Sequence, residues 1–92
     1  MRLDLFLKAS RLVTRRSVAK ELCDAGRIKV NDLVARASKE IKVGDEIELQ
    51  RGGRLTKVRV AGLPAAKQCS RDQAGSLFEI IEDTRFADDI FH

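Results

Sequence analysis

The stretch over residues 2–31 constrains the fold most strongly, because two helical patterns and a strand follow one another there. Apolar residues recur at i, i+3, i+4 and i+7 from Leu3 onward, which predicts a first helix over about Leu3 to Leu12. A second apolar stripe, which begins at Val18, predicts a helix over 15–25. Residues 28–30 then alternate as a strand does. The unit is therefore a helix, a turn, a helix and a strand.

The second helix has a predicted boundary at each end. Thr14 stands at the N-cap position, where its hydroxyl could accept a hydrogen bond from a free backbone amide. Gly26 stands at the C′ position, where glycine adopts a left-handed conformation at least cost. These signals predict a well-defined helix between them.

Basic residues gather on this unit. Arg16 and Lys20 lie one turn apart, opposite the apolar stripe of the second helix, and Lys8 and Arg11 form a similar pair on the first. Arg15 opens the second helix, where free amides add partial positive charge. Arginine forks suit phosphate oxygens, so the arrangement predicts a docking surface for phosphates. The alternative is a solvated surface that serves solubility only.

The order of these residues resembles a known motif. The pattern RLDxFL…SR…RR…A…G.I.VN…GD.I is similar to the alpha-L RNA-binding motif, or S4 domain, over about residues 2–50. The whole chain is most similar to the small bacterial ribosome quality-control factor P (RqcP) family and is related to the small ribosome-associated heat-shock proteins. The resemblance implies an α+β fold in which two N-terminal helices pack on a small, mainly antiparallel sheet. It supports an RNA-binding surface made of Arg2, Lys8, Ser10, Arg11, Arg15, Arg16, Lys20, Arg27, Lys29 and Asn31. Asp4 is expected to pair with Lys8 instead.

The middle of the chain is predicted to form two hairpins. Residues 33–35 return after the first strand, but the turn reads Asn31-Asp32 where the families usually have Asn-Gly. Because Asp is a poorer residue for two positive φ angles, a different turn type is expected. Residues 46–50 and 56–60 alternate on either side of Gly52-Gly53, a strong hairpin signal.

The C-terminal part is predicted to form a short helix over about Arg71 to Asp83. Ser70 to Gln73 fits a capping box, and apolar residues keep helical spacing from Ala74 to Ile81. Gly75 weakens a helix interior, however, and the alternation of Phe78 with Ile80 also fits a strand.

Length and charge indicate one small domain over residues 1–92, with a motif core at 2–50 and an acidic segment at 72–92. Residues 1–71 carry 17 basic and 8 acidic side chains, a difference of +9, and residues 72–92 carry 1 and 6, a difference of −5. The body is a candidate polyanion binder and the tail is not. No signal peptide or membrane span is indicated, and Cys23 and Cys69 are expected to be free thiols in the cytoplasm.

The residues suggest no enzyme, cofactor or metal site. The one histidine is His92, and neither Ser10 nor Ser17 has a histidine partner nearby in the sequence. Phe6 and Phe78 both fit core positions, so no exposed aromatic is expected for stacking on single-stranded bases. We therefore expect recognition of structured RNA through its shape, phosphates and 2′-hydroxyls.

The resemblance implies a ribosome-associated function. Factor P relatives bind the large (50S) ribosomal subunit obstructed by peptidyl-tRNA, touch large-subunit rRNA and tRNA together, and support tailing of the nascent chain, which implies a tailing factor as a further partner. One alternative is a heat-shock-type recycling factor for 50S particles that carry nascent chain-tRNA. Others are an accessory subunit of an RNA-modifying enzyme, or a module that binds an acidic protein.

Overall fold

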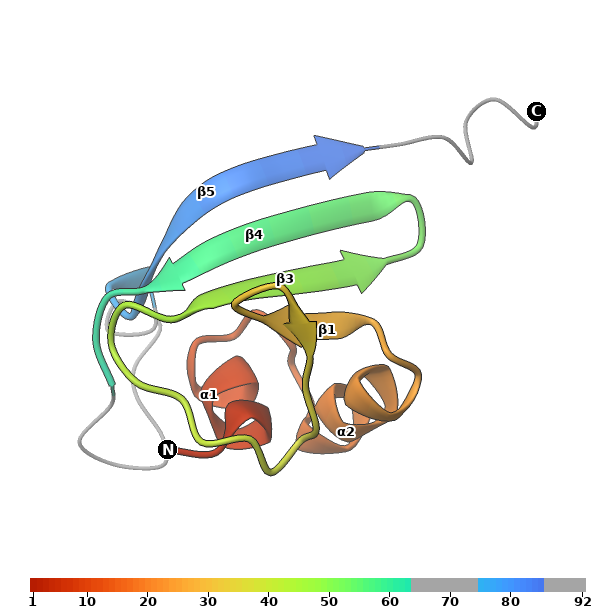
Figure 1. Ribbon diagram of the computed structural model, residues 1–92, viewed down its shortest axis with the longest axis horizontal. Helices are drawn as coiled ribbons and strands as arrows, with labels where there is room; N and C mark the ends of the chain where they lie inside the picture. Colours follow the sequence, from red (N-terminus) through yellow and green to blue (C-terminus); the bar gives the residue numbers. More distant parts are fainter. Residues whose placement is uncertain (64–74, 86–92) are drawn as a thin grey trace.

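Two helices lie on one side of a five-stranded antiparallel sheet in the computed structural model, which describes residues 1–63 and 75–85 (Figure 1). The elements are α1 (Leu3–Ala9), α2 (Arg16–Asp24), β1 (Ile28–Val30), β2 (Leu33–Val34), β3 (Glu46–Arg51), β4 (Arg54–Val60) and β5 (Phe78–Arg85). The strand order is β2-β1-β3-β4-β5. The predicted α+β fold with two N-terminal helices on an antiparallel sheet is confirmed. No helix among the described residues has the length and apolar character needed to cross a membrane.

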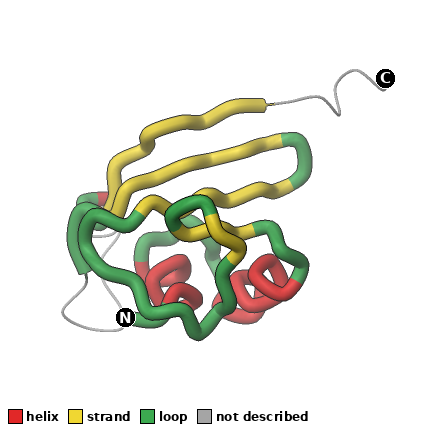
Figure 2. The backbone as a smooth tube through the Cα atoms, in the orientation of Figure 1, coloured by secondary structure: helices red, strands yellow, loops and turns green. Residues whose placement is uncertain are grey.

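The core lies between the helices and the sheet face that they cover. Its largest fully buried apolar side chains come from α1, the turn that follows it, the β2–β3 connection and alternate positions of the strands: Leu3, Phe6, Leu7, Val13, Ile28, Ile41, Ile47, Val58 and Val60. The β2–β3 connection passes the start of α1, where the amide of Leu3 donates to the carbonyl of Lys39 at 2.8 Å. Figure 2 shows this long loop beside the helices. It ties the N-terminus to the body of the domain.

The first helix is shorter than the sequence predicts. It ends at Ala9, and Arg11 has a φ of +63°, a left-handed conformation that a continuing helix cannot contain. The amide of Arg11 donates to the carbonyl of Lys8 at 3.0 Å and that of Val13 to the carbonyl of Leu7 at 3.1 Å. These bonds close the helix end without the glycine that usually occupies such a position.

The predicted end of α2 is confirmed, but its predicted start is not. Gly26 has a φ of +74°, its amide donates to the carbonyl of Cys23, and the amide of Arg27 donates to the carbonyl of Leu22. This pair of bonds is a Schellman motif. At the other end the cap position falls on Arg15 rather than Thr14, and no side chain caps the helix. The first-turn amides of α2 therefore keep their capacity to bind an anion.

The turn between β1 and β2 keeps two left-handed residues despite the aspartate. Asn31 and Asp32 have φ angles of +52° and +69°, as a primed hairpin turn requires. The expected change of turn type is therefore wrong. Neighbouring hydrogen bonds hold the turn, because the Asn31 side chain accepts from the Glu46 amide at 3.0 Å and donates to the Asp45 carboxylate at 3.2 Å.

The predicted C-terminal helix is wrong over residues 78–83. These residues belong to β5, which pairs along the edge of β4 from Val60↔Phe78 to Arg54↔Arg85. The register shifts near Lys57 and Val58, so β5 contains a bulge at Ile81. The bulge interrupts the alternation of side chains, and the resulting apolar spacing imitates a helix. The part of the prediction before residue 75, and Cys69, lie outside the described residues.

Candidate nucleic-acid interface

A buried carboxylate holds two of the predicted RNA-binding arginines. Asp4 is 0% exposed, and its oxygens lie 3.2 Å from Nε of Arg2 and 3.0 Å from Nε of Arg16. Both arginine side chains are about two-fifths exposed. The expected pairing of Asp4 with Lys8 is therefore wrong, because the carboxylate faces inward, where it meets α2 and the N-terminus. The ion pairs bring two guanidinium groups together beside the start of α2.

The other cations that precede β1 are exposed and free of ion pairs among the described residues. Arg15, the N-cap residue of α2, directly precedes Arg16, and Lys20 follows Arg16 by one turn. We name the whole set the helix-side cations: Arg2, Lys8, Arg11, Arg15, Arg16, Lys20 and Arg27. Asp24 continues the Arg16 and Lys20 stripe at the other end of the helix. The positive charge on α2 is therefore concentrated at its N-terminal half.

Three predicted RNA-binding residues have structural roles. Ser10 is 3% exposed, and its hydroxyl donates to the carbonyl of Leu7 at 3.2 Å. The side chain of Asn31 links the first hairpin to β3, and Lys29 lies 3.8 Å from the carboxylate of Glu48 on the neighbouring strand. None of the three offers a free charge or an open hydrogen-bonding group comparable with that of the helix-side cations.

The sheet face that lies away from the helices carries a network of paired charges. Lys57 lies 3.4 Å from Glu46 and 3.6 Å from Asp32, and Arg59 lies 3.4 Å from Glu46. Asp32 first and then Glu46 raise the pKa of Lys57, as carboxylates near an ammonium group do. We name Lys29, Asp32, Glu46, Glu48, Lys57 and Arg59 the sheet-face network. Its three cations and three carboxylates balance.

The described residues form no cluster of three or more histidine, cysteine or acidic side chains that could hold a metal. Cys23 is a free thiol, 5% exposed, and burial, with Asp4 and Asp24 as smaller causes, raises its pKa to about 11. A thiol with such a pKa stays protonated near neutral pH and is a poor nucleophile. Cys23 is therefore a core residue.

Sequence reasoning did not identify Asp4 as the centre of the arginine pair. Helical spacing places Lys8 one turn from Asp4, whereas Arg16 is twelve residues away and approaches only because α2 packs against α1. The one local signal was the acidic residue within the otherwise apolar first turn of α1. A charged residue on the buried face of a helix requires a partner, and that requirement could have pointed to an arginine of α2.

The helix pair, the first hairpin and the exposed arginines together define the class of S4-type RNA-binding domains. The S4 domain family model matches residues 1–47. The chain is 42% identical over 90 residues to the RQC P-site tRNA stabilizing factor of Streptococcus pneumoniae, which covers 98% of this chain and 100% of that protein. It is 39% identical over 88 residues to the factor of the same name from Bacillus subtilis, which covers 96% and 100%. The chain therefore belongs to the S4 domain proteins and, among them, to the family of RQC P-site tRNA stabilizing factors.

The fold is also similar to that of a solved structure of the heat-shock relatives. A trimeric structure of heat shock protein 15 from Vibrio cholerae has a TM-score of 0.78 and 25% sequence identity, and the match covers 99% of this chain and 86% of that one. The resemblance to both families is confirmed.

Proposed function

We propose that the chain stabilises P-site tRNA in ribosome quality control as a non-enzymatic RNA-binding factor in the cytoplasm. Its membership of the RQC P-site tRNA stabilizing family supports this function. In the finer form of the proposal it contacts large-subunit rRNA and tRNA together on 50S particles obstructed by peptidyl-tRNA, and acts beside a factor that extends the nascent chain.

The main structural support for RNA contact is the pair of arginines, Arg2 and Arg16, held by the carboxylate of Asp4. Arg16 donates to the buried carboxylate from Nε at 3.0 Å, and Arg2 donates to it from a terminal guanidinium nitrogen at 3.4 Å. Each half-exposed guanidinium group therefore keeps at least one terminal nitrogen without a hydrogen-bond partner among the described residues. Two guanidinium groups fixed side by side bind a phosphate with less loss of side-chain freedom than two free side chains would. The uncapped N-terminus of α2 adds backbone donors next to them.

The remaining helix-side cations supply the long-range electrostatic part of binding. Lys8, Arg11, Arg15 and Lys20 form no ion pairs within the described part of the chain, so phosphates can replace their counterions. If five or six phosphates are contacted, log K should fall against log salt with a slope of roughly −4 to −5. Ser10, Lys29 and Asn31 contribute to the fold of the surface rather than to direct contact.

The test is sedimentation of the intact protein with purified 50S particles, either vacant or carrying peptidyl-tRNA. We expect preferential binding to the particles with peptidyl-tRNA and loss of that binding in the double variant Lys8→Ala, Lys20→Ala. The matched control is the double variant Lys29→Ala, Lys57→Ala, which removes the same charge from the sheet-face network. Equal binding by the two double variants would contradict the proposed surface, and equal binding to both particles would contradict the dependence on tRNA.

A further inference from the structure

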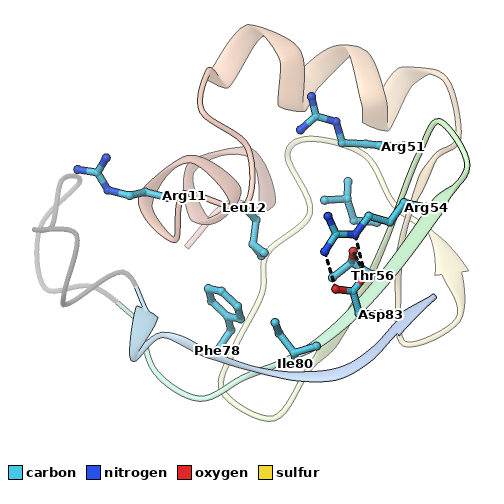
Figure 3. A pocket seen from close by; sticks show the side chains of 9 residues that line it. Arg11, Leu12, Arg51, Arg54, Thr56, Phe78, Ile80 and Asp83 are labelled. Carbon is cyan, nitrogen blue, oxygen red and sulfur yellow. Dashed lines mark hydrogen bonds and ion pairs between the residues drawn. The ribbon is translucent and has the colours of Figure 1, made fainter. Parts of the chain in front are cut away.

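A hollow opens on the helix side of the sheet where β4 and β5 extend past the helix pair. Its walls come from the turn after α1, the ends of β3 and β4, and β5 (Figure 3). It holds about 240 Å³, below the roughly 300–1,000 Å³ of sites for drug-sized ligands. The hollow therefore suits one flat ring rather than a large cofactor.

The floor of this hollow is apolar and includes an aromatic ring. Leu12, Phe78 and Ile80 lie together there, and Phe78 is only half-buried. The ring was expected in the core, but β5 is a strand, and its pairing with β4 places Phe78 opposite Val60 at the edge of the core. The bulge at Ile81 then lets Phe78, Ile80 and Asp83 all contribute to the same hollow. An accessible aromatic face in a basic protein is a platform for a nucleobase.

The rim of the hollow is cationic. Arg11 and Arg51 are exposed at opposite ends, and neither forms an ion pair with the residues that the structure describes. Asp83 is the one carboxylate among the described residues that line the hollow. It accepts hydrogen bonds from Nε of Arg54 at 2.7 Å and from the hydroxyl of Thr56 at 3.4 Å. The charge of Asp83 is compensated within the protein. In Figure 3 the Arg51 side chain lies above the hollow and that of Arg11 points away from it, so Arg51 supplies the positive charge that has no carboxylate partner among the described residues.

We propose that this hollow binds a single unpaired nucleotide of RNA, with its base on Phe78 and its phosphate at Arg51. The proposal rests on the proposed RNA-binding function and deepens it, since it adds recognition of an unstacked base to contact with structured RNA. Charge favours RNA over an apolar peptide, because the described lining residues offer arginines, and their carboxylate, Asp83, is already paired with Arg54. Arg11 also belongs to the helix-side cations, so the hollow adjoins the proposed phosphate surface.

The experiment compares the affinity of the intact protein for a blunt RNA duplex and for the same duplex with one unpaired adenosine. We expect the wild type to prefer the second by about fivefold or more, the lower end of the range for stacking of a base on an aromatic side chain. Phe78→Leu should remove this preference and leave affinity for the blunt duplex unchanged, whereas Phe78→Tyr should keep it. Arg51→Ala should reduce affinity for the unpaired duplex more than Arg59→Ala, the matched control from the sheet-face network.

The outcomes separate this inference from the proposed function. The nucleotide site would be overturned if the wild type and Phe78→Leu showed the same ratio of affinities for the two duplexes. The helix-side surface would stand in that case if both proteins still bound RNA and Lys20→Ala weakened binding to both duplexes. Absence of any RNA binding by the wild type would overturn both. If Phe78→Leu does not fold, as judged by thermal melting, an equal effect of Arg51→Ala and Arg59→Ala overturns the nucleotide site.

Discussion

The helix side and the outer sheet face carry similar basic residues but use them differently. On the sheet face, Lys29, Lys57 and Arg59 each lie within 4 Å of a carboxylate of a neighbouring strand or turn. Among the helix-side cations, only Arg2 and Arg16 are paired with a carboxylate of the residues that the structure describes, and they share the single buried carboxylate of Asp4. The comparison teaches that the number of cations does not locate an RNA surface. Cations without a carboxylate partner locate it better, because an RNA phosphate gives them an anionic partner that the protein does not supply.

The largest expected effect follows from removing both partners of Asp4. The double variant Arg2→Ala, Arg16→Ala leaves a buried charge uncompensated and should lower the free energy of unfolding by roughly 3 kcal/mol, the lower end of the range for such a change. Urea denaturation measures it. Adding Asp4→Asn should restore part of the loss but not RNA binding. A double variant as stable as the wild type would contradict the role of Asp4.

The next effect concerns Cys23, which is buried beneath the helix side. Its pKa is raised from 9.0 to about 11 in the folded protein, mainly by burial. The folded state thus keeps the thiol protonated while the unfolded chain ionises it, so this contribution to stability is complete below about pH 9 and is lost as pH rises towards 11. The loss is up to about 1.4 kcal/mol per pH unit. The free energy of unfolding, measured against pH, should fall more steeply for the wild type than for Cys23→Ala between pH 9 and 11. Parallel curves for the two proteins would show that folding does not protect the thiol from ionisation.

A matched pair of lysines tests the comparison directly. Lys20→Ala should weaken RNA binding and make the slope of log K against log salt less negative by about 0.7–0.9, because one phosphate contact is lost. Lys29→Ala should leave the slope unchanged, because Glu48 already accompanies that lysine. Both should change the free energy of unfolding by less than about 0.5 kcal/mol. Filter binding at several salt concentrations distinguishes them, and equal slopes would remove the distinction between the two faces.

The smallest effect comes from releasing charge on the sheet face. Glu46→Gln removes the carboxylate that lies beside both Lys57 and Arg59. We expect slightly tighter, salt-dependent binding of non-specific RNA, with no change in the preference for 50S particles that carry peptidyl-tRNA. The corresponding change at an acidic residue outside the network, Glu21→Gln, is the control for net charge. A gain in specific binding would mean that the sheet face is part of the interface.

The structure also shows which local patterns were sufficient for prediction. The start of α1, the end of α2 at Gly26 and the alternation of β3 and β4 all follow from periodicity and turn residues within a few positions. The first helix was predicted three residues too long, because the left-handed conformation of Arg11 has no signature in its residue type. The strand β5 was missed because a bulge disturbed its period of two.

The sequence by itself determined that the first half of this chain forms an S4-type helix pair and hairpin, and that this half carries most of the basic residues. Helical spacing and turn chemistry are local, so they can be read along the chain. Only the tertiary structure decided which cations are neutralised: it set Arg16 against Asp4, Lys57 against Asp32 and Glu46, and β5 against β4. Ion pairing and strand pairing depend on distances between residues far apart in sequence, which packing alone fixes. The same packing left Phe78 half-exposed beside arginines that pair with no carboxylate in the described part of the chain.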